Sequence, residues 1–112
     1  MIQIKIGGVP EHFNLPWHLA IEDGAFKAAG IDLQWQDIPE GTGRMSKLLR
    51  EEKLDVACIL TDGIVKDIAA GNASRILQVY VASPLLWGVH APGTIEANNV
   101  RQLEDAKFAI SR

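Results

Sequence analysis

The chain has 112 residues, of which 47% are hydrophobic and 22% charged. This balance is typical of a globular domain and excludes a disordered, collagen-like or coiled-coil chain, and at this length roughly 65% of the unfolded surface can be buried around one core. Eleven Lys and Arg stand against fourteen Asp and Glu, which gives a formal net charge of −3. No basic block follows a path that a phosphate backbone could occupy, so we expect no nucleic-acid partner.

The cysteine count and the N-terminus constrain the cellular compartment only in part. Cys58 is the single cysteine, so no internal disulfide is expected. Met1 is followed by no basic stretch, long apolar stretch and cleavage site, which predicts no signal peptide. Two compartments remain open: the cytoplasm if Met1 is native, and the periplasm if a leader was removed. The apolar stretch from Val79 to Val89 is interrupted by Pro84 and Gly88 and is too short to cross a bilayer, so no membrane insertion is expected.

The first third of the sequence predicts a strand, a helix and a second strand. Ile2 to Val9 alternates apolar and polar residues before a glycine-containing loop, which indicates a strand. Pro16 to Ala29 has helical spacing of apolar residues, with Gly24 as a point of bending and Gly30 as the C-terminal cap. Ile31 to Gln36 alternates again and predicts a strand with one buried face.

The middle of the sequence continues this alternation of element types. Arg44 to Glu52 predicts an amphipathic helix. Asp55 to Leu60 is continuously apolar after its first residue, which favours a central strand covered on both faces. Thr61 is predicted to cap a helix that runs through Ala70 and ends at Gly71 and Asn72.

The last third predicts further strands and one short helix. Arg75 to Ala82 is predicted as a strand, Leu86 to His90 as an extended segment, Val100 to Asp105 as a helix, and Phe108 to Ser111 as a final strand. Strands separated by helices favour right-handed crossovers and a mainly parallel sheet with helices on both faces. The predicted fold class is therefore α/β, a three-layer sandwich.

Three loops are the predicted location of function. In open parallel sheets, ligands bind beyond the carboxyl ends of the strands, and here those ends carry Pro10 to Trp17, Pro39 to Arg44 and Thr61 to Gly63. Each loop leads into a helix N-terminus, where unpaired N–H groups and a partial positive charge favour an anionic or carbonyl-rich small ligand. The candidate ligand-binding residues are Pro10, His12, Asn14, Trp17, Gly41, Thr42, Gly43, Arg44, Thr61, Asp62 and Gly63.

Each candidate also has a purely structural interpretation. The Gly41 to Gly43 turn with Arg44 could hold an anion, but it lacks the lysine and the length of a P-loop, and a turn beside a solvated arginine is the alternative. His12 could contact either a ligand or water. Thr61, Asp62 and Gly63 have the chemistry of a helix cap as well as that of a binding loop. Trp17 is the tryptophan expected at the ligand, whereas Trp35 is expected to pack in the core.

No constellation for catalysis or metal binding is present in the sequence. The three histidines, His12, His18 and His90, have no recognised ligand spacing, and Cys58 lies in the most apolar predicted strand with no basic neighbour to activate it. We therefore expect neither a metal nor a cofactor, and the sequence predicts binding in preference to catalysis.

Three stretches resemble a known family. They are the strand Ile4 to Pro10, the helix and strand from Pro16 to Leu33, and the segment Leu54 to Ala57. They are similar to the first lobe of type 2 periplasmic-binding-fold proteins, in the NMT1/THI5-like group that contains the nitrate-, sulfonate- and thiamine-precursor-binding components of ABC importers. The tail from Ala106 to Arg112 is similar to the segment at which such proteins cross into their second lobe.

The resemblance implies a function and its alternatives. Family members hold a small solute in a cleft between two lobes and deliver it to an ABC permease. Residues 1–112 would then be a single lobe, with the second lobe absent, and the isolated lobe is expected to self-associate through exposed apolar edges. Two alternatives stay open: a cytosolic enzyme on the same fold, of the menaquinone- or thiamine-pathway type, and a ligand-sensing effector domain. The thiamine-pathway enzymes use a cysteine-rich motif that Cys58 alone does not supply.

Overall fold

A parallel sheet of three strands forms the centre of the first part of the molecule. The computed structural model describes residues 1–84 and 86–110. It divides into two units, of which the first is Met1–Gln78 and the second begins at Val79. In the first unit, β1 (Ile2–Gly8) lies between β2 (Ile31–Asp37) and β3 (Val56–Ala57), and both neighbours run parallel to it. The predicted strands at both ends of the first helical region are thus confirmed.

The prediction that residues 55–60 form the central strand is wrong. Only Val56–Ala57 joins the sheet, at its edge, and among the described strands β1 is the central one. The sequence pattern is misleading on which strand is central, because apolar side chains line only one of the two faces of β1 over most of its length. On the other face, Gly7 alone reaches the core, where a Cβ at this position would come within 2.7 Å of the Leu54 side chain.

One face of the sheet is covered by the helices between β1 and β2. The expected bend at Gly24 is confirmed, because its left-handed backbone (φ 74°) separates α1 (Leu15–Glu22) from α2 (Ala25–Ala28). A short 3-10 helix, η1 (His12–Asn14), precedes α1. Trp17 of α1 stacks on Trp35 of β2 at a centroid distance of 6.2 Å and on Phe26 of α2 at 6.0 Å. This aromatic stack attaches both helices to the sheet.

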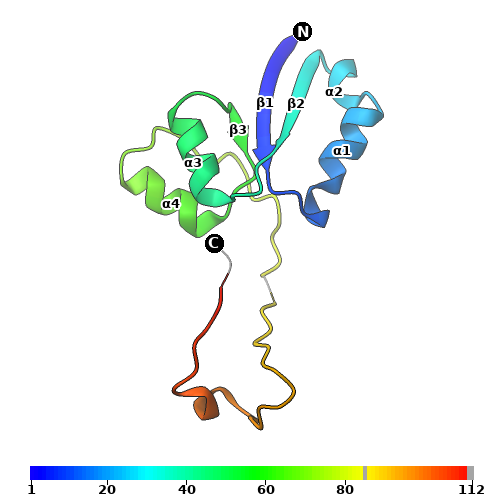
Figure 1. Ribbon diagram of the computed structural model, residues 1–112. Coiled ribbons are helices and arrows are strands. Elements are labelled where there is room, and N and C mark those ends of the chain that lie inside the picture. Colours follow the sequence, from blue (N-terminus) through cyan, green and yellow to red (C-terminus); the bar gives the residue numbers. More distant parts are fainter. Residues whose placement is uncertain (85, 111–112) are drawn as a thin grey trace. The chain divides into compact units, whose positions relative to one another are not determined.

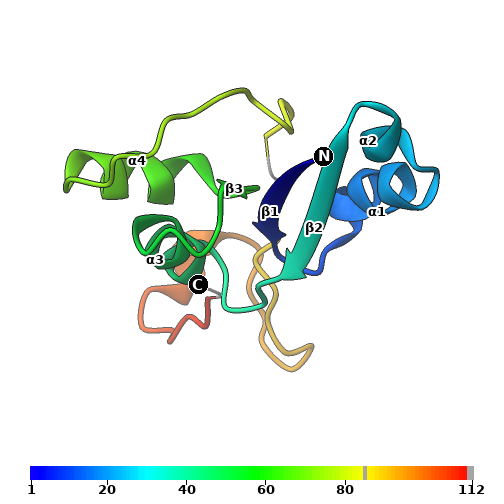
Figure 2. The same ribbon diagram turned by 90° about the horizontal axis from the view of Figure 1, so that it is seen from above.

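The opposite face is covered by α3 (Thr42–Arg50) and α4 (Thr61–Ala69). Strand register explains the two-sided arrangement, since Ile6 pairs with Trp35 while Gly7 pairs with Ala57, and successive residues point to opposite faces. The core beneath α3 consists of buried apolar side chains, Ile38, Met45, Leu48 and Leu54. Figures 1 and 2 show α1 and α2 on one side of the strands and α3 and α4 on the other. The predicted α/β class with helices on both faces is confirmed.

A polar cluster joins α3 to α4. Arg50 of α3 donates hydrogen bonds to both carboxylate oxygens of Asp67 in α4. Asn72, just beyond α4, donates to Asp67 Oδ2 (2.6 Å) and to the carbonyl oxygen of Ser46 (3.3 Å). These hydrogen bonds, that from Asn72 first and that from Arg50 second, hold the pKa of Asp67 below its ordinary value of 3.8. The cluster thus stabilises the charged form of a carboxylate that links two helices.

The sequence from Arg75 onward folds differently from its prediction. Residues 75–82 form no strand, and neither do residues 108–110, while Ser111, the end of the predicted final strand, lies outside the described residues. The predicted helix is present as a single 3-10 turn, η2 (Val100–Leu103), with a capping box between Asn99 and Gln102. Alternating apolar residues indicate a tendency to form strands, but a strand also needs a neighbour to pair with, and the two-residue ladder of β3 supplies little.

Candidate functional site

The three predicted loops leave the sheet at one common edge. All three strands are parallel, so their carboxyl ends coincide. The backbone N–H of Ile38, just after β2, donates to the carbonyl oxygen of Gly8 at 2.8 Å, and that of Cys58, just after β3, donates to Gly7 at 2.9 Å. We refer to residues 9–14, 38–44 and 58–63 together as the rim. Most of the predicted ligand-binding residues lie in these segments, with Trp17 one turn further along α1.

The first rim segment is organised around a buried asparagine. Asn14 is 1% exposed, and its Nδ2 donates to the carbonyl oxygen of Val9 at 2.8 Å. Its Oδ1 is buried without a hydrogen-bond partner among the described residues. The Asn14 amide group thus holds the loop closed, while Pro10 and His12 are exposed.

The second and third segments bring two helix N-termini together. Thr42 Oγ1, at the start of α3, accepts a hydrogen bond from the backbone N–H of Leu60, which precedes α4, at 3.4 Å. A Cβ at Gly63 would collide with the methyl group of Thr42, so the two first turns are in direct contact. Gly41 is buried and has φ 86°, a conformation that strongly favours glycine. The turn into α3 is thus fixed by its glycine.

Neither of these helices has a side-chain cap. The N-cap residues are Gly41 for α3 and Leu60 for α4, and no side-chain cap hydrogen bond is formed in either case. The prediction that Thr61 caps α4 is wrong, because helical geometry begins at Thr61 itself and places the cap one residue earlier. Two adjacent helix starts therefore present backbone N–H groups and partial positive charge at the same place. The amides concerned belong to Thr42, Gly43, Arg44, Thr61, Asp62 and Gly63.

The charged candidates at the rim differ in their surroundings. Arg44 is exposed, in the first turn of α3. The pKa of Glu51 is lowered, chiefly by its hydrogen bond to Lys53, and Arg44 is among the weaker charges that act in the same direction. Asp62 is exposed in the first turn of α4. Helical spacing places it on the row of Val65 and Ala69, whereas Gly63 faces α3.

Trp17 lies next to the rim and also packs in the core. It is half-buried in the aromatic stack and lies close to the side chain of Cys58, which follows β3. Burial raises the pKa of the Cys58 thiol, and the neighbouring Trp17 indole acts more weakly in the opposite direction. His18 packs edge-on against Trp35 at 5.1 Å. The sequence did not indicate the Trp17–Cys58 contact, because no spacing signal connects residues that meet only through the sheet.

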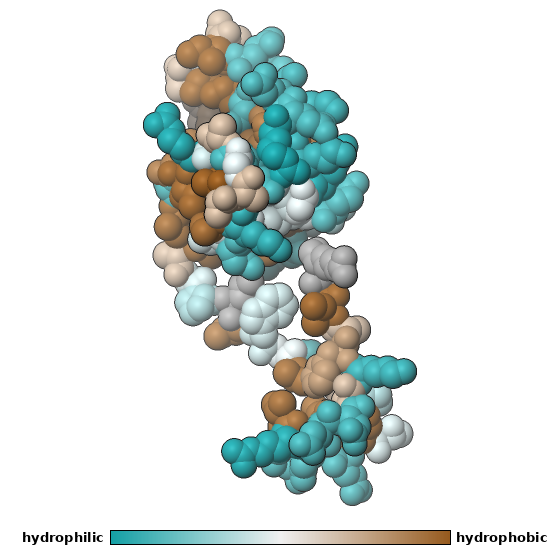
Figure 3. Space-filling model, turned by 90° about the vertical axis from the view of Figure 1, so that its left-hand side faces the viewer, coloured by the Kyte–Doolittle hydropathy of each residue, from teal (hydrophilic) through white to brown (hydrophobic). Residues whose placement is uncertain are grey.

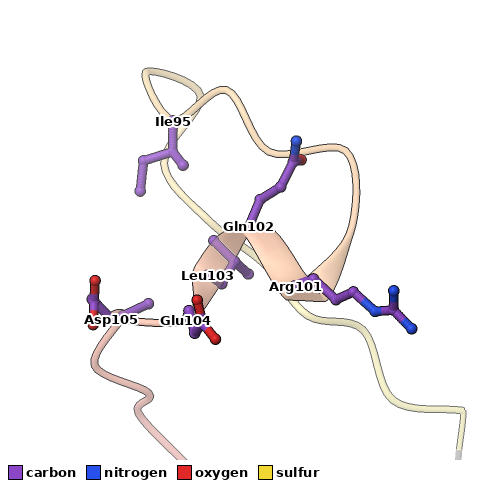
Figure 4. A pocket seen from close by; sticks show the side chains of 7 residues that line it. Ile95, Arg101, Gln102, Leu103, Glu104 and Asp105 are labelled. Carbon is purple, nitrogen blue, oxygen red and sulfur yellow. The ribbon is translucent and has the colours of Figure 1, made fainter.

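The described residues contain few other features of a binding site. Within residues 1–84 and 86–110, no three His, Cys, Asp or Glu side chains gather as metal ligands would, and no helix has the length and apolar character needed to cross a membrane. An open depression in the second unit is lined by residues around η2, and Figure 4 shows Arg101 extending to the opposite side from Asp105. It includes none of the predicted site residues. A second depression runs along α4.

A comparison with solved structures is consistent with this geometry. The chain superposes with a TM-score of 0.60 on the conserved CA3427 gene product of Candida albicans, which is described as defining a new family of proteins with the generic periplasmic binding protein fold. The two are 36% identical over 64% of this chain and 24% of that one. This chain is similar to a protein with the periplasmic-binding fold. It spans about a quarter of that protein's length. No family model matches the sequence, and no curated protein matches it.

Proposed function

We propose that this chain binds a small anionic or carbonyl-bearing solute at the rim, and that it serves an ABC-type importer as a lobe of its solute-binding component. The observation that carries the proposal is the contact between two uncapped helix N-termini, α3 and α4, at the carboxyl edge of a parallel sheet. The similarity to a protein with the periplasmic-binding fold supports a ligand-binding role. Substrates of the NMT1/THI5-like group, including nitrate, sulfonates and thiamine precursors, define the chemical range to test.

The charged residues at the rim narrow the range of ligands that we expect. Arg44 offers a forked donor to an anion, while Asp62 lies in the first turn of α4 and opposes a dense negative charge there. The backbone amides at the start of α3 should therefore attract an anion more strongly than those at the start of α4. A ligand with a single delocalised charge, such as nitrate or a monoanionic sulfonate, fits this balance better than a dianion.

A titration followed by amide NMR shifts tests the proposal. Nitrate, methanesulfonate, acetate and uracil would each be added to ¹⁵N-labelled protein. Binding at the rim predicts saturable shifts of the Thr42 to Arg44 and Thr61 to Gly63 amides, with little change along β2. Saturable shifts confined to other parts of the chain, or no saturable shift with any of these probes, would contradict it.

Gly43 offers a substitution that separates binding from folding. A Cβ at this position meets no atom within 4 Å, so a side chain there has open space. We expect Gly43→Val to weaken binding of whichever probe saturates by about tenfold, because the branched side chain blocks approach to the α3 amides. Gly43→Ala is the matched control and should retain most of the binding. Parallel loss of binding and of the unfolding midpoint in the valine variant would instead identify Gly43 as part of a structural turn only.

A further inference from the structure

An apolar groove runs along the outer flank of α4, away from the rim. It is lined by Val65, Ile68, Ala69, Ser74, Arg75 and Ile76. Val65 is 49% exposed, Ile76 is 53% exposed and Leu77, next in the chain, is 80% exposed. Figure 3, which views the molecule from the α4 side, shows apolar side chains gathered along one flank of the first unit and hydrophilic ones along the other. Contiguous exposed apolar surface of this kind marks an interaction site.

Two opposite charges lie at the two ends of this groove. Asp62 occupies the first turn of α4, one turn before Val65, and Arg75 lines the groove near the end of the helix. Both side chains are exposed, and within residues 1–84 and 86–110 neither forms an ion pair. Acidic at one end and basic at the other, the groove is complementary in charge to a copy of itself turned end for end.

We propose that a second copy of this chain docks on the groove, with the two α4 helices antiparallel about a two-fold axis. In this arrangement Val65 of each copy faces Ala69 of the other, and Asp62 of each copy meets Arg75 of the other. A two-fold interface uses the same patch on both subunits, which is what a charge-complementary groove provides. Antiparallel alignment also places the positive end of each helix dipole beside the negative end of the other. The small side chain of Ala69 permits close approach of the helices.

Sedimentation equilibrium of the full chain tests this pairing. The unaltered protein is expected to sediment as a dimer whose dissociation is concentration-dependent. Val65→Asp places a charge at the centre of the groove and is expected to weaken dimerisation by a hundredfold or so. Leu19→Asp is the matched control, because Leu19 is also a helical residue that is 49% exposed, but it belongs to α1. This variant should dimerise as the unaltered protein does.

A charge exchange identifies the geometry. Asp62→Arg and Arg75→Asp each create like charges across both symmetric contacts, and each is expected to weaken dimerisation by about tenfold. The double variant restores opposite charges and should recover most of the loss, with far-UV circular dichroism verifying that each variant is folded. Ligand binding at the rim is measured separately by NMR. The dimerisation proposal and the proposed function can therefore fail independently of each other. A monomeric chain overturns the proposal. Equal effects of Val65→Asp and Leu19→Asp on dimerisation, or a double charge variant that dimerises more weakly than both single variants, overturn it as well.

Discussion

Gly63 shows how a single missing side chain sets the spacing of the rim. It lies in the first turn of α4, where a Cβ would meet the methyl group of Thr42 at the start of α3. Gly43, one position beyond Thr42, has open space around it. Two glycines with the same first-turn context thus serve different purposes. One permits contact between two helices, and the other leaves the backbone at the start of α3 exposed.

These two glycines lead to a prediction on stability. Gly63→Ala is expected to reduce the free energy of unfolding by about 1–2 kcal/mol, because overpacking must displace Thr42. Gly43→Ala should instead leave stability unchanged or raise it by up to about 1 kcal/mol, since alanine favours the helix. Urea denaturation measures both. Combining Gly63→Ala with Thr42→Ser removes the colliding methyl group and should recover much of the loss, and a combination no more stable than Gly63→Ala alone would show that the Thr42 contact does not set the spacing.

At the scale of elements, the link between α3 and α4 depends on one charged carboxylate. Asp67 accepts hydrogen bonds from Asn72 and Arg50, and its pKa is lowered by them. A lowered pKa in the folded state means that the unfolded chain takes up the proton first as the pH falls. The stabilisation is therefore fully present above the ordinary value of 3.8 and is lost as the pH falls through the folded-state pKa.

The lowered pKa of Asp67 predicts how the effect of Asp67→Asn on stability depends on pH. The variant is expected to be less stable than the unaltered protein at pH 7, and the difference should shrink as the pH is lowered through 4 towards 3. Glu40→Gln, which neutralises an exposed loop carboxylate, is the control and should show little difference at either pH. Urea unfolding at the two pH values measures the differences. A gap between Asp67→Asn and the unaltered protein that persisted undiminished at pH 3 would show that the lost hydrogen-bond geometry, and not the charge, is responsible.

Element by element, the sequence was most informative where the signals are local. Gly24 and Gly30 are predicted to mark a bend and a helix end, and both adopt a positive φ in the structure. The position of β3 at the sheet edge depends instead on pairing with β1, which no local pattern records. The same holds for the rim. Its location follows from strand direction, but the turn of Asn14 towards Val9 and the meeting of Trp17 with Cys58 depend on the tertiary fold.

At the scale of the whole molecule, the two units differ in how their backbone is held. In the first unit, the central strand β1 is bonded on both sides, and Ile6 is 1% exposed. In the second, backbone hydrogen bonds between described residues include only short-range ones, such as Ile95 N–H to Pro92 and Ala106 N–H to Leu103. Leu86 and Trp87 are 96% and 78% exposed. Local stability should differ accordingly, since it follows buried contacts and protected hydrogen bonds.

Hydrogen exchange read by mass spectrometry checks this contrast. Peptides that cover β1 and α3 are expected to exchange last, with protection approaching that of global unfolding, whereas peptides within residues 86–94 should exchange at the earliest time point. Peptides that cover α1 are an internal reference of intermediate protection, because this helix has no buried residue. Early protection of residues 86–94, comparable to that of β1, would show that a partner surface orders them in solution.

The aromatic stack between α1 and β2 has a spectroscopic consequence. Trp17 and Trp35 are stacked, with Cys58 close to Trp17 and the edge of His18 against Trp35. Side chains packed against an indole ring alter its fluorescence, and both stacked tryptophans have such neighbours. Trp87 stands almost alone in water. We therefore expect the exposed Trp87 to contribute separately from the stacked pair, so that the intrinsic fluorescence of the native chain reports on both units.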